Sequence, residues 1–180
     1  MQNLKQLIEN NTFVVVDLET SGLSVHDFII EVGAVKIEKG KICDEFSTFV
    51  NSVQLESLPE EIVELTGITC EQLKGAPYVD EVLKNLYAFA KDSILVAHNL
   101  PFDFGFLRNW GFWCGVHFDG FEKDALDTVA LAKEILGDKV KNYRLATLAD
   151  YFHIAFTNHR ALADAQTAAK ILLNLGRLVP

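Results

Sequence analysis

Cysteine, proline and methionine are scarce in this 180-residue chain, which contains three cysteines, four prolines and one methionine. The cysteines (Cys43, Cys70 and Cys114) are odd in number and widely spaced, which argues against a disulfide framework and a C-x-x-C zinc clip. No apolar run reaches the roughly 18 residues of a membrane span, and the N-terminus lacks a basic segment followed by an apolar one. We therefore expect a cytoplasmic protein with no membrane partner.

Basic residues are also few, because 16 Lys and Arg stand against 25 Asp and Glu, which gives a net charge of −9. This balance argues against a protein that grips a long nucleic-acid duplex with a broad basic face. The excess of acid lies in residues 1–90, which hold 15 acidic and 6 basic side chains, whereas residues 91–180 hold 10 of each. A ligand that is held locally remains compatible with this charge.

The chain has no internal repeats, low-complexity tracts or Pro/Gly/Ser-rich linkers, so we expect one domain over residues 1–180. Apolar, β-branched runs predict strands at 13–16, 29–37, 42–50 and 93–97, with a hairpin turn at Lys39-Gly40 and a short fifth strand just before Asp127. Helical spacing predicts helices at 59–65, 77–90, 101–111, 127–136, 145–152 and 161–175, with Gly111 ending the third of these. Strands followed by helices in this order predict an α/β sheet.

Two carboxylates, Asp17 and Glu19, directly follow the first apolar run. Residues two apart in a strand point to the same face, so a continued strand would place the two side by side, and burying such charges is costly. A bound cation would remove that cost. The alternative is that the strand ends in the turn Thr20-Ser21-Gly22 and that both acids face water.

The segment His98-Asn99-Leu100-Pro101-Phe102-Asp103 follows the fourth predicted strand and enters a helix. Since α/β sheets place their sites at the carboxyl ends of strands, Asp103 would arrive beside Asp17 and Glu19 if strands one and four are neighbours. Taken alone, Asp103 could be a helix-dipole partner, and His98 could be a satisfied polar residue at a strand end.

The last predicted helix begins with the segment His159 to Asp164. Asp164 lies among alanines, on a surface that would normally pack against something, and a buried carboxylate needs a partner. The alternatives are an ion pair between Asp164 and Arg160, four residues apart, and a surface position for His159.

Together the three segments contribute four carboxylates and one imidazole. Oxygen ligands suit Mg²⁺ or Mn²⁺ better than zinc, and two such ions about 4 Å apart stabilise the attacking and leaving oxygens of a displacement at phosphorus. We therefore predict two divalent cations as cofactors, with His159 as the general base that takes a proton from the attacking water. The predicted metal ligands are Asp17, Glu19, Asp103 and Asp164.

The segments 16–23 (VDLETSGL), 98–103 and 159–164 resemble, in this order, the three exonuclease motifs of the DEDD superfamily, over about residues 11–175. The spacing of His159 and Asp164 resembles the histidine branch of that superfamily. Within it, the chain looks most like the proofreading 3′-to-5′ exonucleases of bacterial replicative polymerases, the epsilon subunit of DNA polymerase III and its relatives. The resemblance implies an RNase H-like α/β fold, with a mixed five-stranded sheet flanked by helices on both faces.

The resemblance also implies a role for each site residue. Asp17 would contact both cations, Glu19 and Asp164 the cation beside the attacking water, and Asp103 the other cation. Leu23 would wedge against a base at the 3′ end, whereas Phe102 could equally belong to the core. The full set implied to contact the 3′-terminal nucleotide or to shape its pocket is Thr20, Ser21, Gly22, Leu23, Leu65, Thr66, His98, Asn99 and Phe102.

We therefore expect an enzyme that removes nucleoside 5′-monophosphates from single-stranded or frayed 3′ ends of DNA, in proofreading beside a replicative polymerase subunit. The alternatives are an RNA-trimming exoribonuclease of the ribonuclease T or oligoribonuclease type and a non-catalytic nucleic-acid-binding module on the same fold. Basic side chains of the second half predict a path for a phosphate backbone toward His159. They are Lys133, Lys139, Lys141, Arg144 and Arg160.

Overall fold

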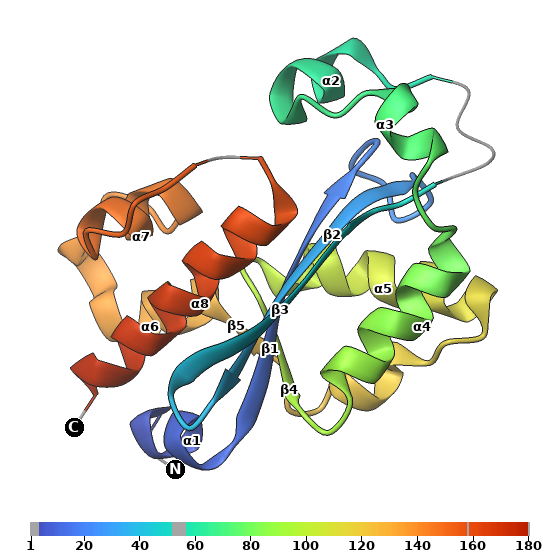
Figure 1. Ribbon diagram of the computed structural model, residues 1–180. Helices are drawn as coiled ribbons and strands as arrows, with labels where there is room; N and C mark the ends of the chain where they lie inside the picture. Colours follow the sequence, from blue (N-terminus) through green and yellow to red (C-terminus); the bar gives the residue numbers. More distant parts are fainter. Residues whose placement is uncertain (1–3, 52–56, 158, 180) are drawn as a thin grey trace.

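A five-stranded sheet forms the centre of the protein in a computed structural model, which describes residues 4–51, 57–157 and 159–179. Figure 1 views this sheet nearly edge-on, with α1, α6, α7 and α8 on one side, α4 and α5 on the other, and α2 and α3 near one end. The strands are β1 (Thr12–Thr20), β2 (Ile29–Glu38), β3 (Lys41–Phe49), β4 (Ile94–Ala97) and β5 (Leu126–Asp127).

The strand order is β3-β2-β1-β4-β5. β1 pairs antiparallel with β2 and β2 antiparallel with β3, whereas β1, β4 and β5 run parallel to one another. Lys39 and Gly40, with φ of 50° and 71°, form the hairpin turn, because a two-residue turn of this kind needs positive φ at both positions. The predicted mixed sheet is confirmed. Strands β1 and β4 are neighbours, which is the condition under which Asp103 was expected beside Asp17 and Glu19, so the carboxyl ends of β1, β4 and β5 meet at one edge.

All six predicted helices are present, and the last one continues beyond its predicted end. Two further short helices, α1 and α3, were not predicted, because five to seven residues are too few to show a clear helical period. The helices are α1 (Leu4–Asn10), α2 (Glu60–Thr66), α3 (Cys70–Lys74), α4 (Val79–Ala90), α5 (Leu100–Cys114), α6 (Thr128–Leu136), α7 (Leu145–Tyr151) and α8 (Ala161–Leu178), with 3₁₀ turns at Phe118–Phe121 and Gly137–Lys139.

The prediction that Gly111 ends a helix is wrong. Helix α5 continues to Cys114 and ends at Gly115, whose φ of 68° is the left-handed conformation typical of a helix end. Gly111 instead allows a close approach, because a Cβ atom there would lie 2.4 Å from the Val116 carbonyl oxygen. The glycine therefore marks where the chain returns against the helix.

Alternate residues of β1 enter two separate hydrophobic cores. Val14, Val16 and Leu18 pack in the core on the side of α4 and α5, whereas Phe13 and Val15 pack in the core on the side of α8. By the same alternation, Asp17 and Glu19 point to the side of α8. In the described part of the chain, no helix is long and apolar enough to cross a membrane.

Candidate active site

Strand β1 continues past its predicted end at Val16 and runs through Thr20, so the alternative in which Asp17 and Glu19 both face water is wrong. Asp17 lies opposite Gly33, and Glu19 lies opposite Glu31, in the antiparallel register with β2. Both acids are half-buried and share one face of the sheet. The two carboxylates therefore stand side by side at the carboxyl end of a central strand.

Asp103 reaches this strand from the first turn of α5, on the opposite side of the sheet. Its side chain is only 3% exposed, and its Oδ1 atom accepts a hydrogen bond from the backbone N–H of Leu18 at 3.1 Å. Burial raises the pKa of Asp103 to about 8, although this hydrogen bond works in the other direction. A role as helix-dipole partner alone does not account for an acid that turns inward onto β1 between Asp17 and Glu19.

Asp164 comes from the first turn of α8 and is also buried. Its Oδ2 atom accepts the backbone N–H of His159 at 3.2 Å, while its Oδ1 atom is buried without a hydrogen-bond partner among the described residues. The predicted alternative of an ion pair with Arg160 is wrong, because the Arg160 guanidinium pairs with Glu31 at 2.9 Å.

The acids of this cluster raise one another's pKa. For Asp17 the largest cause is burial, followed by the charges of Asp103 and Asp164, and the pKa rises well above its usual value. Burial, and then the charge of Asp164, raises the pKa of Glu19 to about 7, against a smaller opposing effect of Arg160. A set of acids that resist ionising together is typical of a site that binds cations.

The donor set fits a divalent cation. Ligand atoms of Glu19, His159 and Asp164 lie within 4.8 Å of one another, close enough to hold one ion together. The buried and unpartnered Oδ1 of Asp164 is an acceptor that a cation would satisfy. The bond from the Leu18 N–H to Asp103 uses only Oδ1 of that carboxylate.

The loop after β1 carries four of the predicted nucleotide contacts. The Thr20 hydroxyl donates to the Gly22 carbonyl oxygen at 2.6 Å, and the Ser21 hydroxyl accepts the Phe28 N–H at 2.9 Å, so both hydroxyls shape the loop itself. Leu23 is 86% exposed at its tip. Its predicted contact with a base stays a prediction, and the exposed position is compatible with it.

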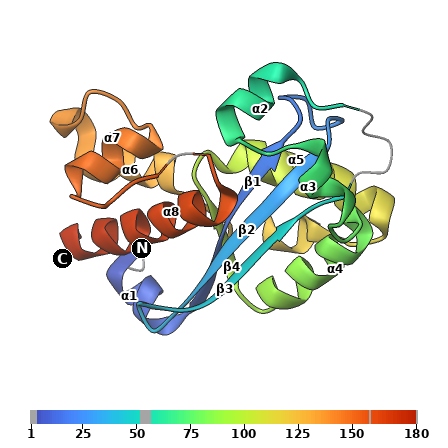
Figure 2. The same ribbon diagram turned by 45° about the horizontal axis from the view of Figure 1, so that its top comes forward.

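Helix α2 carries two more predicted contacts and lies over the end of the sheet at which β1 ends (Figures 1 and 2). Leu65 is half-exposed, whereas Thr66 is buried. The Thr66 hydroxyl donates to the Ile62 carbonyl oxygen at 2.8 Å and accepts the Ile68 N–H at 3.1 Å. Thr66 thus holds the end of its own helix, and Leu65 is the side chain of the two that is open to a ligand.

The remaining predicted contacts follow β4. Asn99 has a left-handed φ of 73°, and its N–H donates to Asp127 Oδ1 at 3.1 Å. His98 Nδ1 lies 2.8 Å from the Thr128 hydroxyl, and burial lowers the pKa of this imidazole. Phe102 packs with the core next to α5, as its alternative assignment predicted.

A cavity of about 520 Å³ lies at the ends of β4 and β5, beside the segment His98–Asn99. Lys133 and Arg144, which were predicted to lie on a path toward His159, share this cavity, which the sequence could not reveal. The cavity is lined by His98, Asn99, Val129, Lys133, Tyr143, Arg144 and Leu145.

One buried charge, Glu31, was not predicted from the sequence. Its signal was a single acid within the otherwise apolar run IIEVGAV, where a charge is costly to bury. Its partner could not be read from the sequence, because Arg160 is 129 residues away along the chain.

The chain matches the model of a family described as exonuclease over residues 14–172. It is 43% identical over 166 residues to a PolC-type DNA polymerase III from Caldanaerobacter subterraneus, covering 91% of this chain and 11% of the relative. The corresponding protein of Bacillus subtilis is 41% identical over 172 residues, covering 94% of this chain and 12% of the relative. A putative bifunctional exonuclease/endonuclease protein of Mycobacterium tuberculosis is 42% identical over 174 residues, covering 92% and 26%.

Solved structures show the same fold at low sequence identity. Exonuclease I superimposes with a TM-score of 0.77 at 16% identity, covering 89% of this chain and 39% of that one. The nuclease domain of 3′hExo, a DEDDh family member bound to rAMP, gives 0.76 at 19% identity and covers 92% and 91% of the two chains. The chain spans about a tenth of the PolC-type relatives and a quarter of the mycobacterial one.

Four acids and a histidine, supplied by three segments in the order of the family's motifs, thus meet at one end of a fold that this family shares. DEDDh exonucleases use divalent metal ions, which agrees with the donor set. The chain belongs to the exonuclease family, as a DEDDh 3′-to-5′ exonuclease domain homologous to the exonuclease domain of PolC-type DNA polymerase III.

Proposed function

We propose that residues 1–180 form one exonuclease domain that removes nucleoside 5′-monophosphates from DNA 3′ ends, with two divalent cations, Mg²⁺ or Mn²⁺, during proofreading. The observation that carries this proposal is the convergence of Asp17, Glu19, Asp103 and Asp164, whose pKa values are all raised by burial. A protein does not keep such a cluster without a counter-charge, and cations supply one.

Each residue has a role that fits its place. Glu19 and Asp164 would hold one cation, Asp103 the other, and Asp17 both. The cations, when bound, would stabilise negative charge on the attacking and leaving oxygens. His159, which sits at the start of α8 beside Asp164, would accept the proton of the attacking water.

DNA as the substrate is supported by relatives that are 41% and 43% identical to this chain and are named as DNA polymerase III. A proofreading domain meets a strand only at its frayed 3′ end, and a broad basic grip is not needed for that. A net charge of −9 agrees with a weak hold on a few nucleotides, with a polymerase partner keeping the domain near the primer.

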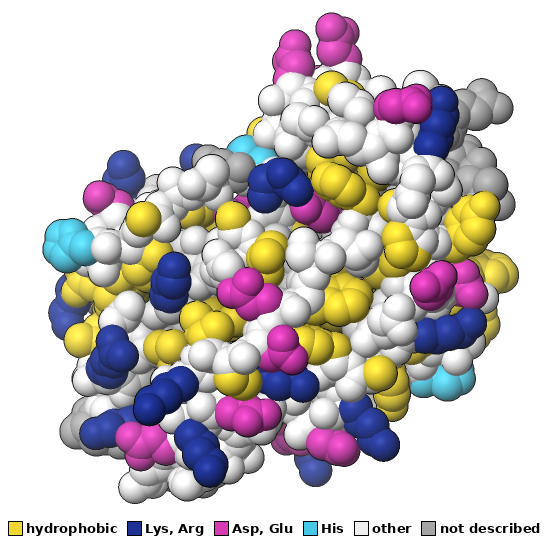
Figure 3. All heavy atoms as spheres, viewed as in Figure 1, with side chains coloured by type: hydrophobic (Ala, Val, Ile, Leu, Met, Phe, Trp, Pro, Cys, Tyr) yellow, Lys and Arg dark blue, Asp and Glu magenta, His cyan; other side chains and the backbone are white. Residues whose placement is uncertain are grey.

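The cavity that contains Lys133 and Arg144 gives the strand a route to the site. It opens at the ends of β4 and β5, on the same edge of the sheet as Asp17 and Glu19. Figure 3 shows basic side chains gathered over the half of the molecule that contains α1, α6 and α8. The phosphates of nucleotides upstream of the 3′ end would lie along Lys133 and Arg144.

Rates on matched DNA and RNA oligomers, each 5′-labelled and offered with a paired or a mismatched 3′ end, test the proposal. We expect Mg²⁺-dependent shortening of DNA that is faster than that of RNA and faster at a mismatched end. Faster shortening of RNA would instead assign the chain to the RNA-trimming enzymes. Binding of the strand with no Mg²⁺-dependent turnover would make the chain a non-catalytic module.

A further inference from the structure

Glu31 is a fifth carboxylate beside the predicted metal ligands. It lies in β2, is 2% exposed, and stands opposite Glu19 in the register of β1 and β2. Residues that are directly opposite in an antiparallel pair share one face of the sheet, so Glu31 also faces α8. Two acids in this position repel each other, and the structure must compensate for burying Glu31.

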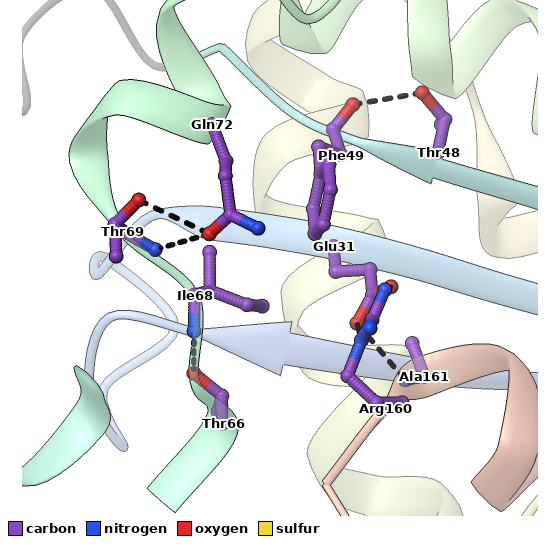
Figure 4. A network of polar contacts seen from close by, with 9 residues as sticks. All are labelled: Glu31, Thr48, Phe49, Thr66, Ile68, Thr69, Gln72, Arg160 and Ala161. Atoms are coloured by element: carbon purple, nitrogen blue, oxygen red, sulfur yellow. Dashed lines mark hydrogen bonds and ion pairs between the residues drawn. The ribbon is translucent and has the colours of Figure 1, made fainter. Parts of the chain in front are cut away.

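Protein donors satisfy both carboxylate oxygens of Glu31. Oε1 accepts from the Arg160 guanidinium at 2.9 and 3.2 Å, and Oε2 accepts from the backbone N–H of Ala161 at 3.1 Å and from Arg160 Nε at 3.3 Å. Figure 4 shows Glu31 against Arg160 and Ala161, with the ring of Phe49 beside Glu31. The guanidinium carbon lies 5.3 Å from the centre of that ring. Glu31 differs in this respect from Asp164, whose Oδ1 has no partner among the described residues.

The two residues that Glu31 holds lie between the candidate base and a predicted ligand. His159 comes directly before Arg160, in a left-handed conformation with φ of 62°, which is unusual for a residue other than glycine. Its N–H donates to Asp164 Oδ2, and the Asp164 N–H donates to the Arg160 carbonyl oxygen at 3.0 Å. The turn from 159 to 164 is thus closed on itself and attached to β2 by Glu31.

Gly33, two residues further along β2, brings the same turn close to the sheet. A Cβ atom at Gly33 would lie 2.2 Å from the Ala161 carbonyl carbon and from the Leu162 nitrogen. One face of β2 therefore docks the start of α8 in two ways, by an ion pair at Glu31 and by the missing side chain at Gly33.

We propose that Glu31 is a positioning residue of the active site, which, through Arg160 and the Ala161 N–H, sets the turn that carries His159 and Asp164. The inference rests on the proposed function for its catalytic consequence. Glu31 itself neither binds a cation nor touches the strand, since all its acceptors are used within the protein. Arg160, although its side chain is half-exposed, acts mainly on Glu31 and not on a phosphate of the substrate.

Hydrogen exchange and steady-state kinetics on four variants, Glu31→Ala, Glu31→Gln, Arg160→Ala and Glu45→Ala, test this inference. Glu31→Ala removes both contacts, and Glu31→Gln keeps the shape but removes the charge, in case the alanine variant folds poorly. Glu45→Ala is the matched control, because Glu45 is an exposed acid of β3 that also bonds to α8, through Gln166 at 2.7 Å, away from the turn.

We expect amides of residues 159–164 to exchange at least about tenfold faster in Glu31→Ala, since charged hydrogen bonds of this kind are worth that much, while the rest of α8 stays protected. We expect kcat to fall about 10- to 100-fold with little change in KM for a DNA 3′ end or in Mn²⁺ affinity, because a displaced base slows the reaction. The exchange rates and kcat of Glu31→Gln should lie between those of Glu31→Ala and the wild type, and Glu45→Ala should behave as the wild type.

Three results would overturn the inference. Unchanged exchange at residues 159–164 would show that Glu31 does not hold the turn, whether or not the protein is active. A large loss of Mn²⁺ affinity in Glu31→Gln would make Glu31 a ligand, and a raised KM with unchanged kcat in Arg160→Ala would make Arg160 a strand contact. Absence of any Mg²⁺-dependent turnover in the wild type would refute the proposed function alone, because the exchange measurement does not depend on activity.

Discussion

Asp103 shows how one side chain can be structural and reactive at once. Its Oδ1 atom ties α5 to the backbone of β1 through the Leu18 N–H, and its charge belongs to the cluster of acids at the end of that strand. Its sequence motif indicated a site residue, since burying a carboxylate after a strand costs free energy unless a partner or a cation compensates for it. The inward turn toward β1 could be expected only after strands one and four were known to be neighbours.

Asp103→Asn is expected to preserve the fold and abolish most of the activity. The amide oxygen can still accept the Leu18 N–H, but the negative charge that would attract a cation is lost. We expect at least about a 100-fold loss of Mg²⁺-dependent turnover, since metal stabilisation of the displaced charge is worth several kcal/mol. Asp80→Asn is the control, because Asp80 also lies in a first helical turn but is exposed and pairs with Lys84 of its own helix. Equal activity of the two variants would contradict the assignment of Asp103.

Helix α8 illustrates what sequence periodicity can and cannot provide. Its alanine-rich pattern predicted a helix from 161 to 175 with one small-residue surface, and the structure packs Ala165, Ala168 and Ala169 against β1 and β2. The pattern could not reveal which strand receives the first turn, because that depends on Gly33 in a distant segment. Gly111 was wrongly predicted to end a helix for the same reason. A glycine in the sequence can mark either a helix end or a close approach of another segment, and the sequence alone does not distinguish the two.

Gly33→Ala is expected to separate the start of α8 from β2. The added methyl group would overlap backbone atoms of Ala161 and Leu162, which cannot rotate away as a side chain can. Such overpacking costs about 1–3 kcal/mol, so we expect a lower melting temperature together with a loss of turnover. Gly75→Ala is the control, because no described atom lies within 4 Å of a Cβ there and its φ of −92° suits alanine. A Gly33→Ala protein as stable and active as the control would contradict this docking.

The acidic charge of the molecule is concentrated, and this has a consequence for its stability. The pKa values of Glu19 and Asp103 are raised to about 7 and about 8, above the values near 4 of unfolded carboxyl groups. Between the pKa values of the unfolded and the folded groups, from about pH 4 to about pH 8, the folded protein binds more protons than the unfolded chain. The free energy of unfolding therefore falls as pH rises through this window. Divalent cations that bind the ionised acids should oppose this loss.

Melting temperatures across about pH 5 to pH 8.5 test this consequence. In a chelator we expect the melting temperature to fall as pH rises through this window, and we expect the fall to be smaller with Mg²⁺ or Mn²⁺ present. The Asp103→Asn protein should show a shallower fall in the chelator, because one of the acids with a raised pKa is gone. A melting temperature that rises steadily with pH in the metal-free protein would contradict the raised pKa values.

The cavity at the ends of β4 and β5 belongs to the molecule as a whole, since α6, α7 and the segment after β4 build it together. If strand phosphates lie there, Lys133→Ala and Arg144→Ala should raise KM for a DNA strand, leave kcat unchanged and reduce the salt dependence of binding. Lys170→Ala, an exposed position of α8 outside this cavity, serves as the control. A KM equal to that of the control would place the strand elsewhere.

The arrangement of the sheet and the clustering of the candidate site residues could largely be predicted, because buried apolar runs and acids that are costly to bury leave clear local patterns. Asp17, Glu19, Asp103, His159 and Asp164 were singled out in this way, and the structure brings them together. What depends on contacts between distant segments could not be predicted. The pairing of Glu31 with Arg160 and the shared cavity of Lys133 and Arg144 are examples of this kind.

The central claim is that this cluster of acids and His159 trims a nucleic-acid strand from its 3′ end with the help of divalent metal. The most direct measurement follows a 5′-labelled single-stranded DNA and its released products with the wild type, Asp17→Asn and His159→Ala, each with Mg²⁺ and with a chelator. We predict stepwise shortening from the 3′ end and release of nucleoside 5′-monophosphates by the wild type with Mg²⁺ only. Each variant should be slower by about 100-fold or more, as expected for loss of a metal ligand or a general base. Undiminished shortening by both variants, or shortening that continues in the chelator, would contradict the claim.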